Sequence, residues 1–371
     1  MIRILYVCST LERSGPTNQL FNLIKYLDRD SFDPQIITLS PEPADSRKAD
    51  FENIGCPVRS LGLTRLQGLL HARRLLQKAI AELAPDIIHT QGLRADVLSS
   101  RLNTTIPRIC TIHNFPQVDY PMTYGRFLGK LMVQHHTRAM LKLDTCVGVS
   151  SAVKDNLVEN WSIPNCTSVQ NGVDSEKFSL PPSGEDRLSI RQKLGFTASD
   201  TIVVSVGWLS SRKDPLTIIR AFQDISSPDL RLVFIGNGSL EKECRRASVN
   251  DKRILFTGRI PNVVDYLQAA DLFVSASTAE GLPYSVLEAM ACGLTPLLSD
   301  IGPHIELLPP DLHSSCIFPV GSSDELAEKM ALLLGSDLTA LSKLTYAHWT
   351  KLFSAHVMAR GYEQVYETLC S

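Results

Sequence analysis

The sequence lacks the features that would place this chain in a membrane-spanning, disulfide-rich or nucleic-acid-binding class. No apolar run approaches the ~18 residues of a membrane span. The first apolar run, Ile4–Cys8, soon meets Glu12 and Arg13, unlike a secretory signal. The nine cysteines form no C-x-x-C pair, which favours reduced, buried thiols. A net charge of −2 gives no indication of nucleic acid as a partner. We therefore expect a cytoplasmic protein whose membrane contact, if any, is peripheral.

Length and composition indicate a globular protein of two domains. The chain has 371 residues, of which 44% are apolar and 20% charged. Lys and Arg exceed Asp and Glu by 19 to 15 in residues 1–170, whereas acidic residues prevail in the remainder. This asymmetry indicates an anionic surface or ligand near the first half.

Short β-branched or apolar runs alternate with helical patterns in the first half. In Thr17–Leu27, for example, apolar residues recur with the period of a helix facing a core. The expected strands are Arg3–Cys8, Gln35–Leu39, Pro57–Ser60, Asp86–Thr90, Arg108–Ile112, Thr145–Val149 and Thr167–Val169. Such alternation predicts a parallel, doubly wound sheet with helices on both faces.

The same alternation restarts after turn residues at Asn171–Asp174 and an apparent linker at Leu180–Gly184. The second set of expected strands is Thr201–Val206, Leu230–Ile235, Ile254–Phe256, Leu272–Ser275, Thr295–Leu298 and Cys316–Phe318. We therefore predict an α/β protein with two tandem Rossmann-like domains, residues 1–174 and 175–350. The carboxyl ends of the two sets of strands are expected to face each other across a ligand-binding cleft.

The most informative stretch follows the strand expected at Leu272–Ser275. It reads Glu280-Gly-Leu-Pro-Tyr-Ser-Val-Leu-Glu288, with Pro283 suited to the first position of a helix. Free N–H groups at a helix start can hold a phosphate. A carboxylate about one turn inside the helix can accept two hydrogen bonds from a ribose diol, and the preceding carboxylate then lies toward the group attached to the phosphate.

This element and several others resemble retaining family 4 glycosyltransferases of the GT-B fold. The resemblance runs in order across almost the whole chain, although each motif alone is weakly specific. The matching stretches are Val169–Asp174 with Phe178 at the domain junction, Ser205–Asp214 at the phosphate loop, Phe234–Leu240, Phe256–Ile260 beside the base, Ala270–Ser277, and Glu280–Gly293.

The resemblance implies roles for individual residues. Lys213 would neutralise the leaving diphosphate, Glu280 would lie at the transferred sugar and Glu288 would hold the ribose; the strand-end His113 would lie beside the donor sugar. We count Glu280, His113 and Lys213 as catalytic candidates. The donor-binding candidates are Gly15, Gly207, Arg212, Lys213, Asn237, Arg259, Ile260, Glu280, Gly281, Leu282, Pro283, Tyr284, Ser285 and Glu288.

One position departs from the family pattern. Trp208 stands where the family usually has an arginine on the diphosphate, and Arg212 is a substitute at a position that does not match. We expect no metal or other cofactor, because Lys213 and a helix N-terminus supply positive potential and no carboxylate pair is placed to hold a cation. The pair His135-His136 is interpreted as surface groups rather than metal ligands.

Two further segments concern partners. Arg126, Lys130, Arg138 and Lys142 make a broad basic stripe along a helix, which is either a solvated face or a peripheral contact with an anionic membrane. Residues 351–371 resemble the family's C-terminal helix that crosses back to the first domain.

The expected function is transfer of a hexose or N-acetylhexosamine from a nucleotide-sugar, with retention. A UDP-sugar is the favoured donor, and the acceptor is a glycan, favoured to be lipid-linked, in O-antigen, capsule or exopolysaccharide synthesis at the inner face of the cytoplasmic membrane. Two alternatives stay open: a UDP-sugar 2-epimerase of the same architecture, and a non-catalytic nucleotide-sugar-binding module, which Trp208 favours.

Overall fold

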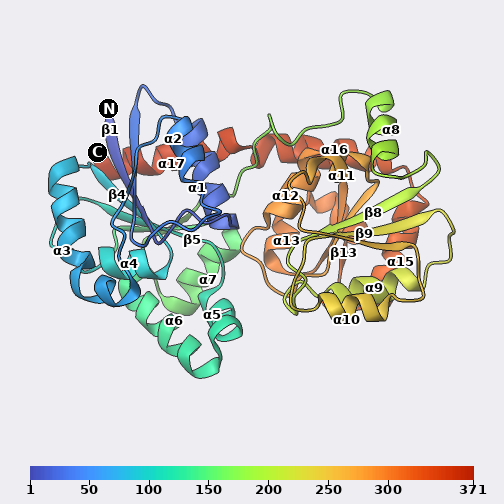
Figure 1. Cartoon of the computed structure of the whole chain (residues 1–371), viewed down its shortest axis with the longest axis horizontal. Helices are drawn as coiled ribbons and strands as arrows, with labels where there is room; N and C mark the ends of the chain where they lie inside the picture. The colour runs from blue at the N-terminus through green and yellow to red at the C-terminus, as the bar shows by residue number, and fades with distance from the viewer. The chain divides into compact units, whose positions relative to one another are not determined.

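The computed structural model describes all 371 residues (Figure 1). The chain divides into two compact units, one formed by Met1–Gly172 with Ala355–Ser371 and the other by Val173–Ser354. The division thus lies two residues before the boundary expected at Asp174. No helix is long and apolar enough to cross a membrane.

The first unit is built on a parallel seven-stranded sheet in the order β3-β2-β1-β4-β5-β6-β7. Its strands are β1 Ile2–Cys8, β2 Phe32–Thr38, β3 Val58–Ser60, β4 Ile87–Gln91, β5 Arg108–Ile112, β6 Thr145–Gly148 and β7 Cys166–Ser168. Its helices are α1 Gly15–Tyr26, α2 Lys48–Asn53, α3 Arg65–Leu83, α4 Leu93–Ser99, α5 Pro116–Tyr124, α6 Arg126–Met140, α7 Ser151–Trp161 and α17 Ala355–Cys370.

Strand β1 shows how alternation creates two cores. Ile4 and Tyr6 face a cluster that includes residues of α1 and α17, whereas Leu5 and Val7 face a second cluster that includes residues of α3. Both faces of this strand are apolar, as a parallel sheet covered by helices on each side requires.

The final helix α17 docks on this sheet through a buried polar chain. Tyr366 Oη lies 3.0 Å from Tyr6 Oη and 2.8 Å from His89 Nδ1. His89 Nε2 lies 2.8 Å from Thr111 Oγ1, which lies 2.9 Å from Tyr362 Oη. Because each buried polar group has a partner, the helix is fixed in register as well as by apolar burial.

The second unit has a parallel six-stranded sheet in the order β10-β9-β8-β11-β12-β13. Its strands are β8 Thr201–Val206, β9 Leu230–Ile235, β10 Ile254–Gly258, β11 Leu272–Ser275, β12 Thr295–Ser299 and β13 Ile317–Phe318. Its helices are α8 Gly184–Lys193, α9 Pro215–Gln223, α10 Glu241–Ala247, α11 Val264–Ala269, α12 Tyr284–Ala291, α13 Gly302–Leu307, the 3₁₀ turn Pro310–Leu312, α14 His313–Cys316, α15 Ser323–Leu334 and α16 Leu338–Leu352.

One expectation about local structure is wrong. His136 is not a surface group: it is 2% exposed, its Nε2 lies 2.8 Å from Asp96 Oδ2, and Tyr120 Oη lies 2.8 Å from its Nδ1. The expected linker at Leu180–Gly184 leads directly into a helix, because α8 begins at Gly184, where the Ser183 hydroxyl accepts a hydrogen bond from Asp186 N. Arg187 and Arg191 of α8 then pair with Asp271.

Candidate functional site

The loops after β8 and β9 touch each other through glycines. A Cβ on Gly236 would lie 2.0 Å from Gly207 O, so no other residue fits there without moving the backbone. Gly236 also has a φ of +131°, which side-chain-bearing residues rarely adopt. The main chains are joined by hydrogen bonds from Gly207 N to Ile235 O and from Leu209 N to Asn237 O.

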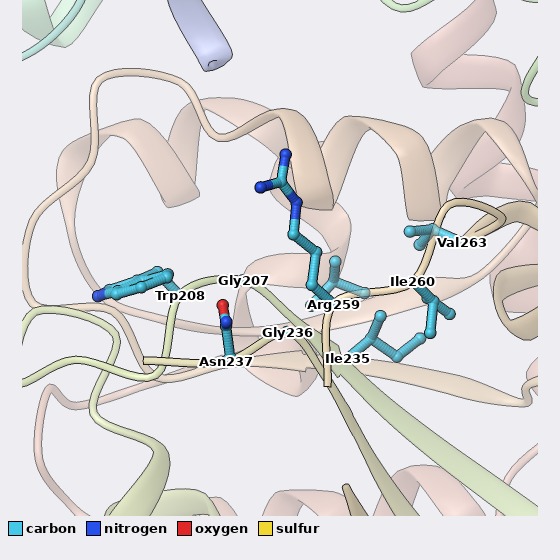
Figure 2. A pocket seen from close by; sticks show the side chains of 9 residues that line it. Gly207, Trp208, Ile235, Gly236, Asn237, Arg259, Ile260 and Val263 are labelled. Carbon is cyan, nitrogen blue, oxygen red and sulfur yellow. The ribbon is translucent and has the colours of Figure 1, made fainter. Parts of the chain in front are cut away.

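A cavity of about 240 Å³ opens beside this contact (Figure 2). Trp208 and Asn237 lie at one end, the apolar side chains of Ile235, Ile260 and Val263 lie toward the other, and Arg259 extends from between them. Its lining residues are Val206, Gly207, Trp208, Ile235, Gly236, Asn237, Arg259, Ile260 and Val263. The apolar end suits a planar base, and the guanidinium suits an anion.

Lys213 and Glu280 form an ion pair in the same unit. Lys213 Nζ lies 2.7 Å from Glu280 Oε1, and their side chains are only 17% and 8% exposed. Burial acts to raise the pKa of Glu280, but the charges of Lys213 and Arg212 outweigh it and hold that pKa below its usual value. Glu280 is therefore an anion at neutral pH.

The backbone places this pair by local capping and by a link between two loops. Asp214 precedes α9, and its carboxylate accepts hydrogen bonds from Thr217 N and Thr217 Oγ1. Thr278 N donates to Arg212 O at 2.8 Å, which ties the loop after β11 to the loop after β8. The two charged residues thus come from loops that follow neighbouring strands of the sheet.

Glu288 lies in α12, one helical segment after Glu280 in sequence, and the charge of Lys213 acts on it. Its carboxylate makes no hydrogen bond or ion pair, and burial raises its pKa to about 7, against the effect of Lys177 and Lys213. No side chain caps the first turn of α12. Glu288 is only partly buried, and its carboxylate is open to accept hydrogen bonds from a ligand with two hydroxyl groups.

The structure brings most of the expected donor-binding residues together, because the loops that carry them follow β8, β9, β10 and β11 at one edge of a parallel sheet. The donor-binding candidate Gly15 and the catalytic candidate His113 belong to the first unit. Gly15 begins α1, where a Cβ would meet nothing within 4 Å. His113 directly follows β5; its Nε2 is buried without a partner, and burial lowers its pKa to about 4, so the ring is neutral.

Sequence reasoning missed His304, a fully buried side chain of α13 that lies in electrostatic range of Glu280 and Lys213. The signal that could have found it is its position just after β12, since ligands of parallel sheets bind at the carboxyl ends of strands. No group of three or more His, Cys, Asp or Glu side chains in the chain is placed to hold a metal ion.

Two family models match the chain in sequence order. Glycosyltransferase Family 4 matches residues 13–177, and Glycosyl transferases group 1 matches residues 186–347. The chain belongs to the glycosyltransferases that these two models describe. The resemblance stated from the sequence motifs is therefore confirmed.

Curated relatives of this family member share about a quarter of its residues. The GDP-mannose-dependent monoacylated alpha-(1-6)-phosphatidylinositol monomannoside mannosyltransferase of Corynebacterium glutamicum is 26% identical over 64% of this chain and 66% of that protein. The UDP-Gal:alpha-D-GlcNAc-diphosphoundecaprenol alpha-1,3-galactosyltransferase of Escherichia coli is 26% identical over 78% of this chain and 76% of that protein. The chain spans just over half, 53% and 54%, of two further curated relatives from Streptococcus pneumoniae and Bacillus subtilis.

Solved structures show that the fold extends over the whole chain. Anabaena Alr3699/HepE, crystallised with UDP, has a TM-score of 0.82 at 19% identity, covering 99% of this chain and 100% of that chain. Sucrose-phosphate synthase from Thermosynechococcus elongatus has a TM-score of 0.83 at 18% identity, covering 100% and 99%. The expected α/β fold with two Rossmann-like domains is confirmed.

Proposed function

We propose that this family member transfers a hexose or N-acetylhexosamine from a nucleotide-sugar to a lipid-linked glycan, with retention of anomeric configuration, in the synthesis of a surface polysaccharide. The observation that carries the proposal is the buried Lys213–Glu280 ion pair with the unpaired carboxylate of Glu288 in the same unit. One cation, one anion and one vacant acceptor match the diphosphate, the sugar and the ribose of a single donor.

In this proposal the base occupies the cavity lined by Ile235 and Ile260, and the ribose diol donates two hydrogen bonds to Glu288. The diphosphate lies at Lys213 and the start of α12, where positive potential stabilises the charge that develops as it leaves. The bond between the anomeric carbon and the phosphate oxygen breaks, the acceptor oxygen bonds that carbon from the same face, and the acceptor proton passes to the leaving phosphate.

The relatives support the choice of ligands without fixing it. The name of the Escherichia coli relative states a UDP-sugar donor and a diphospholipid-linked acceptor, and the Anabaena neighbour is crystallised with UDP and with UDP-glucose. The Corynebacterium relative is named for GDP-mannose, so we test both bases. Trp208 stands where the family usually has an arginine, but Arg259 lines the same cavity and offers a guanidinium there. This favours an active enzyme over a binding module.

Donor binding without a metal is part of the proposal. The expected result is calorimetric binding of UDP or GDP that is unchanged in excess EDTA, because Lys213 and backbone N–H groups take the role of a cation. Loss of binding in EDTA, restored by Mg²⁺ or Mn²⁺, would contradict metal independence while leaving the nucleotide site in place.

We also propose that the enzyme docks on an anionic membrane, at the cytoplasmic face, through the basic stripe. Arg126, Lys130, Arg138 and Lys142 are all exposed. Between them on α6, Phe127, Leu128 and Leu131 are 80%, 51% and 47% exposed. Exposed apolar side chains among cations suit an interface of lipid headgroups and acyl chains. Each cation contributes about 1 kcal/mol at an anionic surface, and screening weakens the attraction as salt rises.

Liposome co-sedimentation tests this docking. Binding to anionic vesicles at low salt should be lost when the four stripe residues become Ala, and should be retained in a variant of matched charge. The control replaces four exposed lysines of the second unit: Lys193, Lys242, Lys252 and Lys343. If both variants lose vesicle binding equally, or if the wild type does not bind vesicles at low salt, the stripe is only a solvated face.

A further inference from the structure

His304 is the most completely buried titratable side chain near the Lys213–Glu280 pair that the proposed transfer does not use. Its residue is 0% exposed. Its Nδ1 lies 3.0 Å from Ser299 Oγ and 3.1 Å from Ser299 O. Ser299 ends β12 and His304 lies in α13, so the ring is anchored at the carboxyl end of a strand.

The hydrogen bonds around Ser299 fix the tautomer of this ring. Ser299 Oγ donates its single proton to Ser277 O at 2.6 Å, so toward His304 it can only accept. The carbonyl of Ser299 also accepts only. Nδ1 must therefore carry the ring proton, and Nε2 carries a lone pair. Burial lowers the pKa of His304 to about 4, so the ring is neutral at physiological pH.

Nε2 of His304 is a buried acceptor with no partner in the chain. A buried polar atom left without a partner destabilises the free protein, and a hydrogen-bond donor on a ligand would satisfy it. The connections of the chain place this ring near the Lys213–Glu280 pair. Ser277, which accepts a hydrogen bond from Ser299, lies on the loop that leads to Glu280, and the charges of Glu280 and Lys213 both act on the ring.

The order of the strands restricts which part of a donor could reach this atom. The cavity for the base is formed by residues at the ends of β8, β9 and β10, Glu280 follows β11, and His304 follows β12 on the far side of β11. A phosphate has no proton to donate at neutral pH, and the ribose diol is taken by Glu288 in the proposed function. Within the nucleotide-sugar, the remaining groups that can donate a hydrogen bond to Nε2 are the hydroxyl groups of the sugar.

We propose that Nε2 of His304 accepts a hydrogen bond from one hydroxyl group of the transferred sugar and so contributes to the choice of sugar. The inference rests on the proposed function, because it places the sugar beside Glu280. His304 discriminates against sugars that lack this hydroxyl or turn it away, since the acceptor is then left buried and unpaired.

The variant His304→Asn tests the role, because an Asn amide can still donate to Ser299 but cannot reach the position of Nε2. Affinities are measured by calorimetry for UDP, GDP and a panel of UDP- and GDP-linked hexoses. The best-bound nucleotide-sugar should lose about tenfold in affinity, as for one hydrogen bond, while the matching nucleoside diphosphate is unchanged. His71→Asn on the exposed face of α3 is the matched control and should change neither.

A second measurement needs no variant. In protein labelled with ¹⁵N-histidine, the nucleotide-sugar should shift the Nε2 resonance of His304, and the nucleoside diphosphate should not. Deoxy analogues of the sugar should include one that loses both the shift and about tenfold in affinity. Equal loss for sugar-linked and free diphosphate in His304→Asn, or an Nε2 resonance that no sugar moves, would overturn the inference. If the wild type binds no nucleotide at all, it is the proposed function that fails.

Discussion

Glu288 gives the sharpest prediction, because its vacant carboxylate makes donor binding depend on pH. Its pKa is about 7 in the free protein, so about nine-tenths of the molecules are ionised at pH 8 and about one-tenth at pH 6. Only the ionised form accepts two hydroxyl hydrogen bonds. The affinity for a nucleotide-sugar should therefore fall about tenfold from pH 8 to pH 6, with a proton released on binding near pH 6.

Calorimetry in buffers of different ionisation enthalpy measures both the affinity and the proton release. A nucleotide-sugar is the better probe than a free diphosphate, because its pyrophosphate has no group that titrates in this range. His113 and His304 do not titrate there either, since burial lowers each pKa to about 4. Glu288→Gln should bind the nucleotide-sugar more weakly at pH 8, and its affinity should no longer depend on pH. Glu328→Gln, at an exposed position of α15, should behave as wild type.

The same carboxylate should affect the stability of the free protein in the opposite sense. A carboxyl whose pKa is raised by folding stabilises the protein fully below about pH 4.5, and that contribution is lost as pH rises through about 7. By linkage the loss reaches about 3 kcal/mol at pH 8. Glu288→Gln should thus unfold at a higher temperature than wild type at pH 8. Wild-type binding and unchanged melting in this variant would together refute the assigned environment.

Three further changes test other parts of the molecule. Lys213→Ala should weaken nucleoside diphosphate binding by about 10–100-fold because one charge-assisted contact is lost, and an unchanged dissociation constant would remove the lysine from the diphosphate. Glu280→Ala should mainly lower turnover in a transfer assay; wild-type kinetics would exclude it from the site. Tyr366→Phe should lower the free energy of unfolding by about 1–3 kcal/mol in denaturant titrations, because His89 and Tyr6 lose a buried partner; a change below about 0.3 kcal/mol would contradict the docking chain.

The fold could be predicted because each strand is a short run of β-branched or apolar residues that is visible in the local sequence. All the expected strands of both sheets are present, and β1 lies within one residue of its expected start. Some helices have weaker local signals than the strands. Helix α8 is mostly polar and is held by Arg187 and Arg191 at Asp271, a contact about eighty residues away in sequence. Helix α5 contains Pro121, which interrupts the helical pattern.

The candidate site shows the same limit. The resemblance to the family's motifs indicated Lys213, Glu280 and Glu288, and the loops that carry them follow adjacent parallel strands and meet at one edge of the sheet. It could not indicate that Lys213 pairs with Glu280 while Glu288 stays unpaired, since these states depend on burial and distances. His304 could not be predicted for a related reason. The tautomer of its ring is set by hydrogen bonds that involve Ser299 and Ser277, and these contacts exist only in the folded protein.

The central claim is that the chain moves a sugar from a nucleotide to an acceptor. The most direct test incubates the enzyme with UDP- and GDP-linked hexoses and a diphospholipid-linked N-acetylglucosamine acceptor, and follows the product by mass spectrometry and its anomeric configuration by NMR. The account predicts nucleoside diphosphate release that requires the acceptor, an α-linked product from an α-linked donor, and no product with Lys213→Ala. A donor converted to its 2-epimer without acceptor, or bound without turnover over a broad acceptor panel, would contradict it.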